Sequence, residues 1–208
     1  MTDTYDIQHT RDQIVEAALP HIPFDGWTMT ALNRAAADLG LNEDAAALAF
    51  PVSATDAIEH HSGLADRKMV EASGDLSDLP IRVKVATVIR TRLEQNMPHR
   101  EAIRRACATL AMPAHAPMAA RCLYRTVDAV WYAAGDTATD WNFYSKRALL
   151  AGVYSSTLFY WLEDASDLDE SFEFLDRRIE NVMQIPKLTG RLKTLADNFP
   201  KPAWFFRA

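Results

Sequence analysis

The chain has 208 residues, of which 49% are hydrophobic and 24% are charged. This balance is typical of a globular protein with a hydrophobic core, and it excludes an intrinsically disordered chain. No uncharged run approaches the roughly 18–20 residues that a membrane span needs. The first residues are acidic where a secretory or mitochondrial leader is basic, so we expect the chain to stay in the compartment where it is made.

The net charge of −6 is unevenly distributed along the chain. Residues 1–75 carry 4 basic and 13 acidic side chains, a net charge of −9, whereas residues 76–208 carry a net charge of +3. Within the latter, residues 187–208 carry 5 basic side chains and one acidic side chain. We therefore expect three units, 1–75, 76–186 and 187–208, with different partners for the acidic and basic ends.

Apolar spacing and capping residues predict helices along the whole acidic unit. The predicted helices run from His9 to Leu19, from a Thr28 or Thr30 cap to just before Gly40, from Glu43 to Ala49 after Asn42, and from a Ser53 or Thr55 cap toward Gly74. Residues 21–27 are interpreted as a turn in which Gly26 takes a positive φ angle.

The middle unit is also predicted to be helical, which makes the fold all-α with about nine to ten helices. Residues 81–85 alternate like a strand, but the Asp78 cap, Pro80 and the helix-forming residues that follow favour a helix. Two further helices are expected, one that starts at about His99 and another that ends at about Ala133. Later helices are expected from the Asp140 cap to Leu162 and from Asp167 or Asp169 to Pro186. The apolar stripe of Leu188, Leu192, Leu195 and Phe199 has helical spacing too.

The first three predicted helices, with a tight turn between the second and third, are typical of a helix-turn-helix. Their pattern, from Arg11 and Ile14 through Gly26-Trp27 to residues 31–41, resembles the N-terminal domain of TetR-type regulators. DNA binding needs basic side chains facing phosphates, yet the predicted recognition helix, 42–50, has two carboxylates, four alanines and no basic residue. We expect no nucleic-acid partner, and a ligand-responsive TetR-type regulator is the alternative function.

Motifs of the common catalytic classes are absent from the sequence. No histidine follows a glutamate by three residues, as in di-iron bundles, and neither a nucleotide-binding glycine loop nor a Gly-x-Ser-x-Gly motif occurs. Cys107 and Cys122 have no zinc-site spacing and are interpreted as reduced thiols. A Ser–His–Asp triad is not excluded by the sequence. We expect no enzymatic activity, no metal and no cofactor.

Aromatic residues are concentrated at the predicted corner formed by residues 130–147. Aromatic residues at helical spacing usually pack in the core, and this is the simpler interpretation of Trp131. Trp141, Phe143 and Tyr144 span too wide an arc of one helix for all of them to face a single core. At least one is therefore expected to be exposed, and exposed aromatic and arginine side chains anchor protein interfaces.

The stretch from Trp131 to Tyr154 strongly resembles the accessory proteins of ubiquinone (coenzyme Q) biosynthesis, most specifically in the block Gly135-Asp136-x-x-x-Asp140-Trp141-Asn142-Phe143-Tyr144. A second stretch, 172–183, resembles them too, and the resemblance covers about residues 5–185. It implies a TetR-like fold, lipid binding, and a partner that is the di-iron demethoxyubiquinone hydroxylase or another hydroxylase of the pathway. It places the partner-binding surface at Val130, Trp131, Asp140, Trp141, Phe143, Tyr144 and Arg147. The family usually reads Phe-Asn-Trp-Tyr where this chain reads Trp-Asn-Phe-Tyr, so the anchor is either Trp141 or Phe143.

The implied ligand, an isoprenoid lipid or a phospholipid, needs an apolar cavity. Candidate wall residues are the apolar side chains of two predicted helices, namely Leu150, Val153, Tyr154, Leu158 and Trp161, with Val85, Ile89 and Leu93 opposite. A filled core explains each of them equally well.

The basic tail has the composition of a segment that lies at a membrane interface. Its candidate membrane contacts are Leu192, Leu195, Phe199, Trp204, Phe205 and Phe206. A C-terminal helix packed on the domain is the other interpretation. The mitochondrial members of the family carry a transit peptide that this sequence lacks, so we expect a bacterial cytoplasmic protein bound peripherally to the inner membrane. A homodimer is left open.

Overall fold

The computed structural model describes residues 2–136, 142–163 and 168–182, and every regular element in these ranges is helical, as the sequence predicts. The helices are α1 (Thr2–Ala18), α2 (Ile22–Asp25), α3 (Met29–Asp38), α4 (Ala45–Ala49), α5 (Asp56–Ser73), α6 (Ile81–Asn96), α7 (Arg100–Leu110), α8 (Ala116–Ala133) and α9 (Asn142–Glu163). Short 3-10 turns, Met97–His99 and Pro113–His115, precede α7 and α8, and a last helix covers 169–182. None of the described helices is both long and apolar enough to cross a bilayer.

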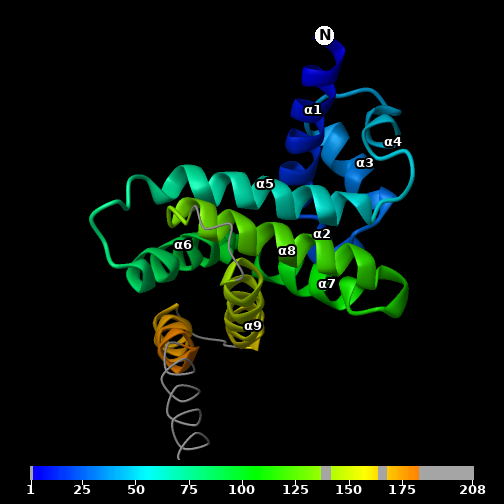
Figure 1. Cartoon of the computed structure of the whole chain (residues 1–208). Coiled ribbons are helices and arrows are strands. Elements are labelled where there is room, and N and C mark those ends of the chain that lie inside the picture. Colours follow the sequence, from blue (N-terminus) through cyan, green and yellow to red (C-terminus); the bar gives the residue numbers. More distant parts are fainter. Residues whose placement is uncertain (1, 137–141, 164–167, 183–208) are drawn as a thin grey trace, which may run out of the picture.

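The helices form two groups that share α5. Helices α1, α3 and α4 lie together at one end of α5, whereas α6 and α8 pack along it (Figure 1). Helix α9 packs against α8. The helix over 169–182 joins this second group, since Leu175 is fully buried there and Asp176 accepts a hydrogen bond from Arg90 at 2.6 Å.

The predicted helix boundaries are mostly confirmed, because caps and glycines set them. The Oγ1 atom of Thr28 accepts a hydrogen bond from the backbone N–H of Ala31 at 3.4 Å, which caps α3. Gly40, with φ of 68°, ends the same helix, and Gly74, with φ of 62°, ends α5. The turn from α3 to α4 therefore has the helix-turn-helix arrangement that the sequence indicates.

Four details of the helix prediction are wrong. Helix α1 starts at Thr2, seven residues before the predicted His9. Residues Ile22–Asp25, interpreted as part of a turn, form the short helix α2 with a proline in its first turn, where a missing N–H costs nothing. Helix α6 starts at Ile81 instead of at an Asp78 cap, because the amides of Val83 and Lys84 bond to the carbonyl of Pro80. Helix α4 starts at Ala45, two residues after the predicted Glu43. The expected cap Asp140 and everything after residue 182 lie outside the described residues.

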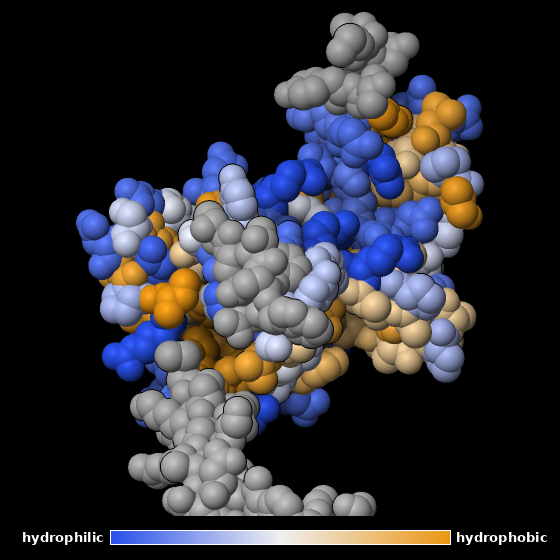
Figure 2. Space-filling model, in the orientation of Figure 1, coloured by the Kyte–Doolittle hydropathy of each residue, from blue (hydrophilic) through white to orange (hydrophobic). Residues whose placement is uncertain are grey.

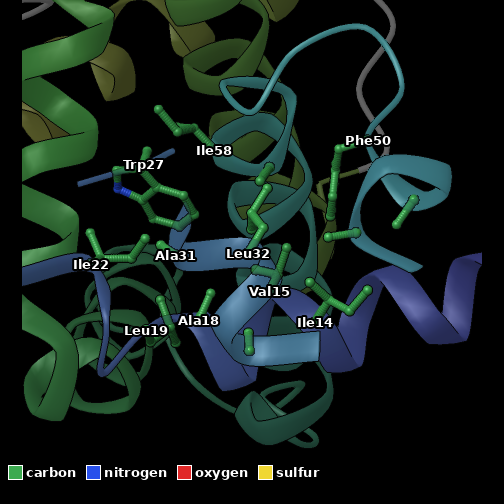
Figure 3. Packing of buried hydrophobic residues seen from close by; sticks show 14 of the residues in the cluster. Ile14, Val15, Ala18, Leu19, Ile22, Trp27, Ala31, Leu32, Phe50 and Ile58 are labelled. Carbon is green, nitrogen blue, oxygen red and sulfur yellow. The ribbon is translucent and has the colours of Figure 1, made fainter. Parts of the chain in front are cut away.

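The first group of helices encloses its own core (Figure 3). Ile14 and Val15 from α1, Leu32 from α3 and Ile58 from α5 are at most 2% exposed. Burying one such side chain stabilises the fold by about 1.5–3 kcal/mol. Trp27 lies in the same core and donates its indole N–H to the carbonyl of Ala102 at 3.0 Å, which ties this unit to α7.

A second core lies between α5, α6, α8, α9 and the last helix. Buried members from these elements include Met69, Ile89, Val127, Val153 and Leu175. Helix α5 thus contributes to both cores, with Ala57 and Ile58 in the first. Because residues of α5 lie in both cores, the two cores are not separated by a break in the chain. The division of the chain at residue 75 therefore stays a prediction.

Candidate functional site: a cavity and an aromatic corner

A cavity of about 320 Å³ lies among α5, α6, α7, α8 and α9. Volumes of this size are at the lower end of the range for ligand pockets. Four predicted wall residues line it: Leu93 from α6, and Tyr154, Leu158 and Trp161 from α9. The three α9 residues are spaced by four and three positions, which places them on one face of that helix.

The other four predicted wall residues are not among those that line this cavity. Val85, Ile89, Leu150 and Val153 are at most 5% exposed and belong to the second core. Their burial favours the filled-core interpretation at these four positions, and their contact with a ligand stays a prediction. The cavity wall instead includes residues that the sequence did not single out, from α5, α7 and α8, such as Ile58, Ile103, Cys107, Ala119, Cys122 and Leu123.

A buried ion pair stands at the inner end of the cavity. Arg92, which lines the cavity, places Nη1 2.6 Å from Oδ1 of Asp66 on α5, and their side chains are 7% and 5% exposed. The Oγ1 of Thr126 donates to the same carboxylate at 2.8 Å, and Nε of Arg125 donates to its other oxygen at 3.2 Å. Nε of Arg92 donates to the hydroxyl of Tyr154 at 2.9 Å. Four helices therefore meet at one polar network.

His61, Cys107 and Tyr154, which line the cavity, are held in their neutral forms. Burial lowers the pKa of His61 to about 3, and the nearby guanidinium of Arg92 lowers it further in the same direction. Burial raises the pKa of Cys107 to about 11 and also raises the pKa of Tyr154. At neutral pH the cavity thus presents an uncharged imidazole, thiol and phenol beside the paired Arg92. Within the described ranges, no three His, Cys, Asp or Glu side chains are arranged to hold a metal ion.

The outer end of the cavity is apolar. Phe159 lines it and is 57% exposed, so it lies at the opening. Ala111 at the end of α7 is exposed, and Ala119 on α8, which also lines the cavity, is half-buried.

The aromatic corner lies where α8 ends and α9 begins. Val130 is fully buried, which leaves it no surface for a partner, and Trp131 is half-buried. The ammonium of Lys146 lies 5.8 Å from the centre of the Trp131 ring and 3.2 Å from a carboxylate oxygen of Asp136. Tyr144 is 72% exposed, as expected of at least one aromatic side chain here. Asp140 and Trp141 lie outside the described residues, and so does the side chain of Phe143.

The predicted partner-binding surface includes both Tyr144 and Arg147, but Arg147 is not exposed. Arg147 is only 9% exposed, because its Nε and Nη2 atoms donate to Oδ1 of Asp128 on α8 at 2.9 and 2.6 Å. A further exposed aromatic side chain, which the sequence did not single out, is Tyr132 on the last turn of α8, which is 75% exposed. The predicted membrane contacts, from Leu192 to Phe206, lie outside the described residues.

Comparisons with known proteins agree on one family. The COQ9 family model matches residues 116–186. The chain is 32% identical to "Ubiquinone biosynthesis protein COQ9, mitochondrial" of Rattus norvegicus over 92% of its own length and 63% of that protein. It is 30% identical to the protein of that name from Homo sapiens over 92% of its length and 62% of that protein. The chain thus spans less than two thirds of these relatives.

A solved structure confirms the fold. The TetR transcriptional regulator from Nitrosomonas europaea superposes with a TM-score of 0.68 over 84% of this chain and 98% of that chain, at 23% sequence identity. At this level of identity the likeness concerns the fold alone. The sequence matches to the COQ9 proteins confirm the resemblance drawn from the sequence, and the solved structure confirms a TetR-like, all-helical fold.

Proposed function

We propose that this protein binds an isoprenoid lipid of ubiquinone biosynthesis in the cavity and presents it to a hydroxylase of the pathway, without catalysing a reaction itself. The observation that carries the proposal is the cavity of about 320 Å³ with a largely apolar lining, in a homologue of proteins named for ubiquinone biosynthesis. Water occupies about 30 Å³ per molecule in the liquid, so the cavity has the volume of about ten waters. It holds one end of a long lipid. Recovery of a bound lipid tests the proposal.

The exposed aromatics at the α8–α9 corner supply the partner surface in this proposal. Tyr132 and Tyr144 come from the two helices that meet there and are both more than 70% exposed. Asp140, Trp141 and Phe143 are proposed for the same surface. Arg147 is assigned a different role, in which it holds α9 to Asp128 of α8.

We expect Tyr144→Ala to weaken the complex with the di-iron demethoxyubiquinone hydroxylase by about 2 kcal/mol, as loss of an interface anchor does. Because the side chain is exposed, thermal stability should change little. The measurement is a titration of the purified hydroxylase by calorimetry. The control is Tyr124→Ala, at a 54% exposed tyrosine that lies on α8 about two turns before Tyr132. Equal affinities for both variants and the unchanged protein would remove Tyr144 from the interface.

The basic tail, 187–208, is proposed to contact the membrane surface. It combines a net charge of +4 with aromatic residues at its end, and each basic residue near an anionic leaflet contributes about 1 kcal/mol. Removing residues 187–208 should therefore sharply reduce sedimentation with phosphatidylglycerol vesicles, and the helical circular dichroism of the rest should persist. Unchanged sedimentation would assign membrane contact to another surface.

The alternative function, a DNA-binding regulator, has the fold in its favour but not the surface. Helix α4, at the position of a recognition helix, consists of four alanines and Leu48. Leu48 is 65% exposed and Val52 just beyond it is 86% exposed. Figure 2 shows hydrophobic residues at this corner of the molecule. DNA affinity depends on cations at phosphates, and this surface offers none on α4. A regulator would bind duplex DNA with a steep dependence on salt.

A further inference from the structure

The polar network at the inner end of the cavity contains a charge that is already neutralised. Arg92 is the cationic residue in the cavity wall, and Asp66 behind it lies 2.6 Å away. Both side chains are more than nine-tenths buried. Asp66 also accepts hydrogen bonds from Thr126 and Arg125, so two hydrogen bonds and the ion pair with Arg92 hold the carboxylate in position. Arg125 approaches from the outer side and is 40% exposed there.

Hydrogen-bonding capacity nevertheless remains at this end. The hydroxyl oxygen of Tyr154 accepts from Nε of Arg92, and no acceptor for the hydroxyl hydrogen occurs among the described residues. The indole N–H of Trp161, which is 1% exposed, likewise has no partner there. Both residues line the cavity. Buried donors without partners are uncommon in proteins, because each costs free energy.

We infer that the inner end of the cavity selects an uncharged, oxygen-bearing headgroup and rejects an anionic one, with Tyr154 as a specificity-determining residue. This inference rests on the proposed lipid-binding function and specifies its ligand class. A carbonyl, methoxy or hydroxyl oxygen can accept a hydrogen bond from the Tyr154 hydroxyl, and no additional charge is buried. A carboxylate or phosphate would enter a largely apolar cavity in which the cation is already paired, and burying an unpaired charge is expensive.

The same geometry implies that the headgroup enters first. The polar network lies at the inner end, whereas Phe159 and Ala111 form an apolar opening. The isoprenoid tail of a headgroup bound near Tyr154 would then leave past Phe159. Burial lowers the pKa of His61 to about 3, so this imidazole is neutral and provides no positive charge to pair with an anion.

The test compares three probes that share a geranyl tail: geranylbenzene, a geranyl-substituted methoxyphenol, and the matching geranyl hydroxybenzoate, which carries a carboxylate at neutral pH. Binding to the full chain is followed by calorimetry. The inference predicts that the phenol binds at least tenfold more tightly than the carboxylate. Tyr154→Phe should lower the affinity for the phenol three- to tenfold and leave that for geranylbenzene unchanged. Equal affinities for the phenol and the carboxylate would overturn the inference.

A second variant asks whether neutralisation of Arg92 excludes anions. Asp66→Asn retains a side-chain oxygen for Thr126 but removes the negative charge, so the geranyl hydroxybenzoate should gain affinity at least tenfold. Glu101→Gln, in an exposed ion pair on α7, is the control and should change nothing. Folding of each variant is checked by its thermal midpoint, and Tyr154→Phe carries the test if Asp66→Asn does not fold. If geranylbenzene does not bind the unchanged protein, the proposed function fails; if it binds while the headgroups are not discriminated, only the headgroup inference fails.

Discussion

Asp66→Ala is expected to lower the free energy of unfolding by about 3–5 kcal/mol, because it leaves the guanidinium of Arg92 buried without its counterion. The carboxylate is 5% exposed and joins residues from α6 and α8 to α5. The measurement is urea unfolding at neutral pH, followed by circular dichroism.

Glu101→Ala is the matched control. Glu101 pairs with Arg104 and Arg105 on the surface of α7, where all three side chains are more than 40% exposed. Exposed pairs contribute about 0–1 kcal/mol. A loss for Asp66→Ala no larger than that of the control would show that the network is not a major contribution to stability.

Acidification is expected to destabilise the protein through His61. Its pKa is about 3 in the folded protein and near 6.5 when solvated, so between these values the unfolded chain binds more protons than the folded one. The free energy of unfolding therefore falls as the pH is lowered through this window, by up to about 1.4 kcal/mol per pH unit. His60 and His99, whose pKa values burial also lowers, act in the same direction.

His61→Gln removes this contribution, so the variant should lose less stability than the unchanged protein between pH 6.5 and pH 4. Slopes are compared instead of absolute stabilities, because the substitution also changes packing against Trp27, whose ring centre is 5.6 Å away. His9→Gln, at an exposed position of α1, should retain the full slope. Identical slopes in all three proteins would contradict the assignment.

Local signals predicted the helices well. Thr28, Gly40 and Gly74 act at the ends where their chemistry places them. Two of the errors arose at residues that are compatible with two local structures. Pro23 fits either a turn or the first turn of a helix. Asp78 can cap a helix, but the first helical hydrogen bonds are accepted by Pro80.

The site was predicted less completely, because burial depends on the neighbouring helix. The spacing of Tyr154, Leu158 and Trp161 indicates a shared face, but the same spacing argument cannot separate cavity walls from core residues such as Val153. Arg147 shares a side with Tyr144 by spacing, yet Asp128 on another helix draws it inward. The pairing of Asp66 with Arg92 joins separate helices and leaves no local pattern.

The most direct test of the central claim is the lipid content of the purified protein, measured by mass spectrometry of an organic extract. We predict a prenylated quinone precursor or another apolar lipid near one molecule per chain. Ala119→Trp fills the cavity from a half-buried wall position and should abolish it, whereas Ala120→Trp, at the exposed next residue outside the wall, should not. An empty extract with no uptake of added geranyl probes, or equal lipid content in both variants, would contradict lipid binding in this cavity.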